Sequence, residues 1–176
     1  MAIIKTQTQE NAQGSVKETY DLVLKKMPFV PKPLQLLSAS PKLLQAQMQS
    51  MGYFMNHEKL SPTLLAYIRF LVALNNDYPY CIELNSSLVK QLANLTDEQL
   101  AEVRADPAKA ILSEKDKALL LFALKAVSAP EDVSKNDMDE LHKLGWEDID
   151  IFDATHHGAS VISAGILFNA FKMNED

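Results

Sequence analysis

The chain contains few of the residues that would mark an exported or membrane-bound protein. It has one cysteine among 176 residues, so no intramolecular disulfide can form. The start carries no positively charged segment followed by an apolar one, and no apolar run reaches about 18 residues. We therefore expect neither a secretory signal nor a membrane span, and we expect the protein to be cytoplasmic.

An excess of positive charge is also lacking. Seventeen Lys and Arg stand against 23 Asp and Glu, which gives a net charge of -6. Without a basic surface, nucleic acid and anionic membranes are not expected as partners. The 47% hydrophobic content and the presence of only five glycines indicate one packed globular domain with a sizeable core.

Apolar residues recur with helical spacing along most of the chain, and no segment alternates as a β-strand would. The pattern predicts an all-α fold, a helical bundle in a single domain over residues 15–176. Residues 1–14 are polar and are expected to form a partly ordered tail or a strap on a neighbouring subunit. The predicted helices are 16–27, a short helix opened by Pro33, 41–56, 62–75, 79–93, 97–105, a helix between Ser113 and Pro130, 135–144, and 147–173.

Helix starts are marked by capping sequences. Ser15 to Glu18 and Thr96 to Gln99 fit capping boxes, and Ser113 and Ser134 are further expected N-caps. In the helix 41–56 one apolar set is expected to face the core. This set comprises Leu43, Leu44, Met48, Met51, Phe54 and Met55.

The segment 61–90 carries the clearest chemical signal. Its first helix, 62–75, is apolar on nearly every face and should be buried, except for Arg69. A buried cation needs a carboxylate or carbonyl partner, which Asp77 or Glu83 could supply; the more ordinary interpretation is an arginine at the edge of the surface with a structural partner. After a break, Cys81 lies in the first turn of the next helix, where the helix dipole favours a reactive thiolate; the alternative is a small core hydrophobe.

The order of these segments resembles a known family. The stretches MPFVPKPLQLLSASPKLL, LSPTLLAYIRFLVALNNDYPYC, LSEKDKALLLFALK and DMDELHKLGW are similar to those of the carboxymuconolactone decarboxylase and alkylhydroperoxidase D (AhpD) family. The peroxidase-related branch is the most similar, and the resemblance covers residues 15–173. It implies an AhpD-like helical bundle, a homo-oligomer (trimer or hexamer), and a thiol site without a metal or other cofactor.

The resemblance also assigns motif positions. Peroxidase members carry a glutamate on the buried helix, then Cys-x-x-Cys, and a histidine four residues after the second cysteine. Cys81 matches the second cysteine, while Ala66, Tyr78 and Asn85 occupy the glutamate, first-cysteine and histidine positions. The usual cycle, in which two cysteines form a disulfide, cannot run here. At most one reactive cysteine remains, and it would need an external thiol as reductant.

Two histidines could substitute as acid or base. His156 and His157 lie in the middle of the last predicted helix, about 100° apart around its axis, so at most one would point at a given site. A histidine packed in the core or at a subunit interface is the more ordinary interpretation. His57 and His142 are expected to be solvated. Four histidines without metal-ligand spacing do not predict a zinc site.

Three functions remain open. The first is an alkylhydroperoxidase-like antioxidant protein, degenerate in its motif, in which Cys81 reacts with peroxides. The second is a carboxymuconolactone decarboxylase-type lyase, with Arg69 holding a carboxylate and His156 or His157 donating a proton. The third is a non-catalytic helical module for binding or oligomerisation, which the three substituted positions favour.

Overall fold

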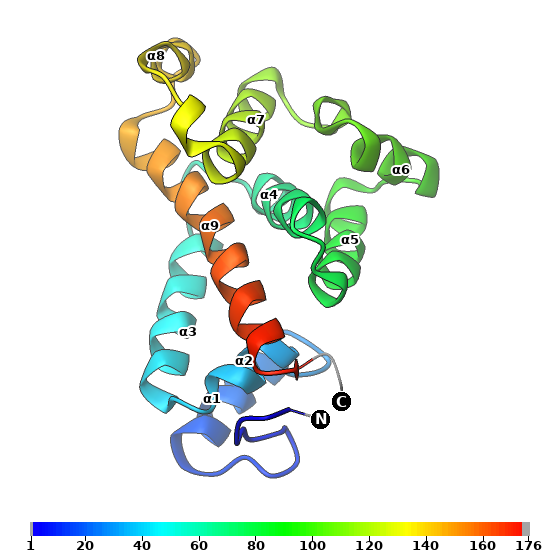
Figure 1. Cartoon of the computed structure of the whole chain (residues 1–176), viewed down its shortest axis with the longest axis vertical. Helices are drawn as coiled ribbons and strands as arrows, with labels where there is room; N and C mark the ends of the chain where they lie inside the picture. Colours follow the sequence, from blue (N-terminus) through cyan, green and yellow to red (C-terminus); the bar gives the residue numbers. More distant parts are fainter. Residues whose placement is uncertain (1, 174–176) are drawn as a thin grey trace. The chain divides into compact units, whose positions relative to one another are not determined.

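The computed structural model describes residues 2–173, and within that range it contains helices and no strand. This confirms the all-α prediction (Figure 1). The helices are α1 (Gly14–Leu24), α2 (Lys32–Leu37), α3 (Pro41–Met55), α4 (Pro62–Asn75), α5 (Pro79–Ala93), α6 (Asp97–Ala105), η1 (Pro107–Lys109), α7 (Glu114–Ser128), η2 (Pro130–Asp132), α8 (Lys135–Lys143) and α9 (Asp148–Ala170).

The chain divides into two compact units. One contains the residues up to His57 together with those from Ile166 onward, and the other is Glu58–Gly165. In the second unit α4 packs against both α5 and α7 (Figure 1). Nine of the fourteen α4 residues are buried, as the apolar sequence predicted. Helix α4 is therefore the core of this unit, and every candidate site residue but His57 belongs to the same unit.

Most helix starts follow their predicted caps. The Ser61 hydroxyl accepts a hydrogen bond of 3.1 Å from the backbone N–H of Leu64, with Pro62 in the first helical position. Thr96 and Ser134 each complete a capping box, and Ser113 caps α7. These local bonds satisfy backbone donors that would otherwise be left over at the helix ends.

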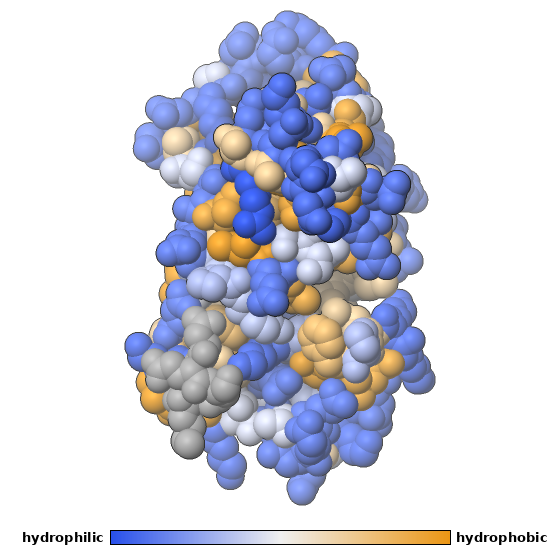
Figure 2. All heavy atoms as spheres, turned by 90° about the vertical axis from the view of Figure 1, so that its right-hand side faces the viewer, coloured by the Kyte–Doolittle hydropathy of each residue, from blue (hydrophilic) through white to orange (hydrophobic). Residues whose placement is uncertain are grey.

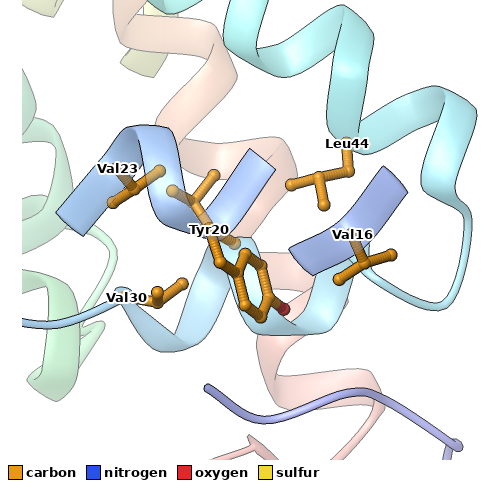
Figure 3. Close-up of a cluster of buried hydrophobic side chains, with 6 residues drawn as sticks. Val16, Tyr20, Val23, Val30 and Leu44 are labelled. Carbon is orange, nitrogen blue, oxygen red and sulfur yellow. The ribbon is translucent and has the colours of Figure 1, made fainter. Parts of the chain in front are cut away.

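The first unit has its own apolar core between α1, α2 and α3 (Figure 3). Tyr20 lies within it, and its hydroxyl donates a 2.9 Å hydrogen bond to the backbone oxygen of Gln7. Gln7 in turn donates its N–H to the Ser38 hydroxyl, at 2.6 Å. The polar segment before α1 is thus hydrogen-bonded to Tyr20 and Ser38 of the same unit. The buried residues of this core are Val16, Tyr20, Val23, Val30, Leu34 and Leu44.

Two predictions for this unit are wrong in detail. Helix α1 begins at Gly14 with Gln13 as N-cap, and no side chain caps it, so the box predicted at Ser15 does not form. The Gln13 N–H instead donates to the Gln7 side chain at 2.7 Å, which shifts the helix start. In α3, Leu43 and Met55 are exposed rather than buried. The apolar set predicted for this helix is wider than the face that it buries.

Helix α9 also differs from its prediction. It spans 148–170 instead of 147–173, and both Gly158 and Gly165 lie within it. A Cβ at Gly158 would lie 3.3 Å from side-chain atoms of Ile68 and Val127. A Cβ at Gly165 would overlap the ring of Tyr78. The glycines therefore allow close packing against α9, and their role is not to end the helix.

Apolar side chains also reach the surface. Figure 2 shows one face, largely hydrophilic, on which smaller apolar patches are interspersed. Helix α9 exposes Ile149, Phe152, Ile166 and Leu167, so it is less buried than its apolar sequence suggested. Among the described residues, no helix has the length and apolar character needed to cross a membrane.

Candidate functional site

A sharp break between α4 and α5 sets the position of Cys81. Asp77 adopts the left-handed conformation, with φ of 51°, and the backbone N–H of Tyr78 still donates to Ala73 at 3.1 Å. Pro79 then starts α5, because its fixed φ suits the first helical position. Cys81 therefore lies in the first turn of α5, as predicted, and its side chain is buried at 7% exposure.

Asn85 links Cys81 to Arg69. Its side-chain amide nitrogen donates a 2.7 Å hydrogen bond to the backbone oxygen of Cys81, one turn earlier. Its amide oxygen accepts a 3.0 Å hydrogen bond from Nε of Arg69, on the neighbouring helix α4. Asn85 is only 2% exposed, so both bonds are shielded from water. Asn85 thus holds the arginine beside the turn that carries the cysteine.

The partner of Arg69 is the Asn85 amide, and neither Asp77 nor Glu83, the two carboxylates considered from the sequence, has a hydrogen bond or ion pair with it among the described residues. The guanidinium is partly buried, and burial lowers the pKa of Arg69, while the Cys81 thiolate acts against this shift. Within the part of the chain that the structure describes, no carboxylate contributes to the pKa of Arg69. Of the two partners expected for Arg69, a carboxylate or a carbonyl, the structure contains the carbonyl oxygen, supplied by the Asn85 side chain.

The protonation of Cys81 differs from the sequence-based expectation. Burial raises the pKa of the thiol above its usual 9.0, and the positive charge of Arg69 offsets only part of that shift. The position of Cys81 at a helix start, taken alone, predicted a lowered pKa. At neutral pH the group is mainly a thiol, so any nucleophilic reaction must proceed through a small thiolate fraction.

The two adjacent histidines lie in different environments. His156 is exposed, and its ring stacks on Phe152 with centroids 6.3 Å apart. His157 is buried at 8% exposure. Burial lowers the pKa of His157 to about 3, and the charges of Arg69 and His156 act in the same direction, while a hydrogen bond to the backbone of Leu65 opposes them. His157 is therefore a neutral imidazole near the Arg69 charge.

Neither of the other motif positions carries the residue of the family pattern. Ala66 is buried in α4, and Tyr78 is partly buried with its ring against Gly165. His142 is exposed and lies 2.7 Å from an Asp148 oxygen, and His57 belongs to the other unit. Among the described residues, no group of three or more His, Cys, Asp or Glu could hold a metal ion.

The residues that the structure brings together are thus Cys81, Asn85, Arg69 and His157. Three of them were predicted as candidates, but the positioning role of Asn85 was missed. The signal was present, because a residue four positions after Cys81 lies on the same helical face. Asn85 had been considered only as the replacement of a histidine.

Comparison of the fold with solved structures gives three similar proteins. An uncharacterized peroxidase-related protein from Silicibacter sp. TM1040 has 23% identity and a TM-score of 0.78, with 98% of this chain and 93% of that chain covered. An uncharacterized peroxidase-related protein from Ralstonia eutropha JMP134, described as an alkylhydroperoxidase AhpD core, has 19% identity and a TM-score of 0.82, with 98% and 90% covered. The chain has the AhpD fold.

A third similar structure shows that proteins of different function share the AhpD fold. It is a cysteine-to-alanine variant of the debrominase Bmp8 in complex with 2,3,4-tribromopyrrole, with 13% identity and a TM-score of 0.77, covering 98% of this chain and 90% of that chain. No protein-family profile matches the sequence, and no curated protein is significantly similar to it. The AhpD fold expected from the sequence is confirmed, and the activity must be inferred from the site.

Proposed function

We propose that the protein reduces hydroperoxides slowly, with Cys81 as its one reacting thiol and an external thiol as reductant. The observation that carries this proposal is the position of Arg69. Its permanent charge lies close enough to lower the pKa of Cys81, and the bond to Asn85 holds it there. The peroxidase-related proteins with the same fold support this assignment.

The reaction balances with one cysteine. The Cys81 thiolate attacks the terminal oxygen of the hydroperoxide, so that an S–O bond forms while the O–O bond breaks. The alkoxide leaves and takes a proton from water, which leaves a sulfenic acid on Cys81. One external thiol displaces water to form a mixed disulfide, and a second external thiol releases Cys81 and the external disulfide. The cysteine is regenerated, and two external thiols are oxidised for each peroxide reduced.

Slow turnover follows from the groups around the sulfur. The raised pKa of Cys81 leaves little thiolate at neutral pH. Ala66 and Asn85 can neither accept nor donate a proton as a glutamate or histidine would, and each such transfer is worth about 10²- to 10⁴-fold in rate. His157 does not replace them, because its pKa of about 3 makes it a weak base.

The same facts disfavour a decarboxylase-type lyase. That function needs a proton donor beside the cation that holds the carboxylate. His157 lies near Arg69 but is neutral above pH values near 3, and His156 is exposed and stacked on Phe152. A neutral imidazole is a poor general acid.

The proposal is tested by following cumene hydroperoxide consumption with glutathione as the external thiol. We expect the wild-type protein to consume the peroxide faster than a Cys81→Ser variant, with two glutathiones oxidised per peroxide. The same rate in both proteins would contradict the proposal and would favour the non-catalytic alternative.

A further inference from the structure

Helix α3 buries little of its own surface. Two of its fifteen residues are buried, and one of them, Leu44, points into the apolar core of the first unit (Figure 3). By contrast, Leu43 is 60% exposed and Tyr53 is 49% exposed, although both side chains are large and mainly apolar. Apolar side chains gathered on the outer side of a helix are typical of a surface that contacts another molecule.

The outer residues of α3 include a stripe with the spacing of a helix–helix contact. It consists of Leu43, Ala46, Ser50 and Tyr53, which follow one another at intervals of three, four and three positions and therefore share one face. None of these four residues is buried, and none is charged. This α3 stripe has a large side chain at each end and two small ones between them.

The α3 stripe is complementary to a second copy of itself. When two identical helices pack antiparallel about a two-fold axis at the middle of the stripe, Leu43 of one copy lies opposite Tyr53 of the other. In the same arrangement Ala46 lies opposite Ser50. The small residues let the two helices approach closely at the centre, and the large side chains cover both ends. A second copy of this chain therefore fits the stripe along its whole length.

The charges on α3 favour the antiparallel orientation. The helix has no acidic residue, and its charged residue, Lys42, lies in the first turn, at the positive end of the helix dipole. Its last turn has no basic residue to offset the negative end. In an antiparallel pair, Lys42 of each copy lies beside the C-terminal end of the other α3, where a cation is stabilising. A parallel pair would bring the two lysines together and leave both C-terminal ends without a cation.

We propose that the α3 stripe of one copy packs antiparallel against the α3 stripe of a second copy and so forms a two-fold dimer. The inference is independent of the proposed function, because Cys81, Asn85 and Arg69 belong to the other unit. One face of a helix of 15 residues is smaller than the area of about 800 Å² per partner in a standard interface. We therefore expect a dimer that dissociates on dilution, with a Kd between about 1 μM and 1 mM.

Association is tested by analytical ultracentrifugation of the full chain at concentrations from about 1 μM to 1 mM. We expect the weight-average mass to rise with concentration from the chain mass of 19.6 kDa toward twice that value. A protein that keeps the mass of a single chain up to about 1 mM would overturn the inference.

Two arginine variants assign the association to the α3 stripe. Ala46→Arg places a long charged side chain at the centre of the stripe and should raise the Kd by about tenfold or more. Gln45→Arg is the matched control, because it adds the same charge at an exposed position of α3 outside the stripe and should associate like the wild type. Both positions are exposed, so thermal unfolding of the dilute proteins should stay unchanged. Association that Ala46→Arg leaves intact, or an equal loss in both variants, would overturn the inference.

A pair of charge variants tests the orientation of the two helices. Leu43→Glu and Tyr53→Lys should each weaken self-association by about tenfold or more, because each places a charge against an apolar side chain. When the two variants are mixed, position 43 of one chain lies opposite position 53 of the other, and the opposite charges attract. The mixture should therefore associate more tightly than either variant alone. A mixture that associates no more tightly than the separate variants would overturn the antiparallel pairing.

Discussion

Nε of Arg69 in α4 donates a 3.0 Å hydrogen bond to the side-chain oxygen of Asn85 in α5, 16 positions later in the sequence. This bond joins the two helices. The other end of the same amide bonds to the backbone oxygen of Cys81. Arg69 is thereby held near the thiol, and its charge moderates the effect of burial on the pKa of Cys81.

The reactivity of Cys81 should rise with pH into the alkaline range. The thiolate is the reacting form, and the pKa of Cys81 is raised above 9.0, so the rate of alkylation by iodoacetamide should still be increasing at about pH 9. Arg69→Met removes the charge that lowers this pKa and should move the rise to higher pH. If the rise in alkylation rate had its midpoint at a lower pH in the native protein than in the urea-denatured protein, the raised pKa of Cys81 would be contradicted.

Asn85 should matter more for stability than other asparagines with a similar bond. Asn85→Ala leaves the Nε of Arg69 without its acceptor, so urea unfolding should show a loss of about 1–3 kcal/mol. Asn76→Ala removes a 2.8 Å bond to the backbone of Val72 at an exposed position and should cost less than about 1 kcal/mol. Equal losses of unfolding free energy in the two variants would show that the hydrogen bond to Arg69 adds nothing to the stabilising effect of Asn85.

His157 should make the protein sensitive to acid. Its pKa of about 3 in the folded state lies below the ordinary 6.5, so the unfolded chain binds a proton that the folded chain does not. Stability should therefore fall as the pH drops from about 6.5 toward 3, by up to about 1.4 kcal/mol per pH unit from this group. His157→Gln should reduce this slope in chemical denaturation, and His156→Gln, at an exposed position, should not. Identical slopes in His157→Gln and the wild type would contradict burial of a neutral ring.

Two helical glycines should respond in opposite ways to alanine. A Cβ at Gly165 would overlap the Tyr78 ring, so Gly165→Ala should destabilise by about 1–3 kcal/mol. Gly52 in α3 has no atom within 4 Å of a new Cβ, so Gly52→Ala should stabilise by roughly 0.5–1 kcal/mol.

A double-mutant cycle checks the cause of the Gly165 effect. In a Tyr78→Ala background the ring is gone, and Gly165→Ala should then cost much less. An unchanged cost would assign the destabilisation to something other than the contact with Tyr78.

The fold could be predicted from local chemistry. Proline and hydroxyl side chains mark the helix starts because they satisfy or remove backbone donors within a few residues, as at Ser61 and Thr96. At α1 the prediction was wrong, because the Gln7 side chain, six positions before Gln13, accepts a hydrogen bond from the Gln13 N–H and the Ser15 box does not form. The core face of α3 was likewise overestimated, because the exposure of Leu43 and Met55 depends on which other helices pack there.

The site could be predicted in part. The position of Cys81 at a helix start follows from Pro79, and the separation of His156 from His157 follows from helical geometry. The pKa of Cys81 could not be predicted, since it is set by burial and by a charge on another helix. The partner of Arg69 was sought among carboxylates, and the sequence gives no measure of which side chain reaches across between helices.

We expect Cys81 to react with hydroperoxides in the folded protein. Intact-protein mass spectrometry after cumene hydroperoxide treatment at about pH 9, with dimedone present to trap sulfenic acid, tests it most directly. We expect one dimedone adduct in the wild type, located at Cys81, and none in Cys81→Ser. A folded wild-type protein that stays unmodified, while the same thiol reacts after denaturation in urea, would contradict it.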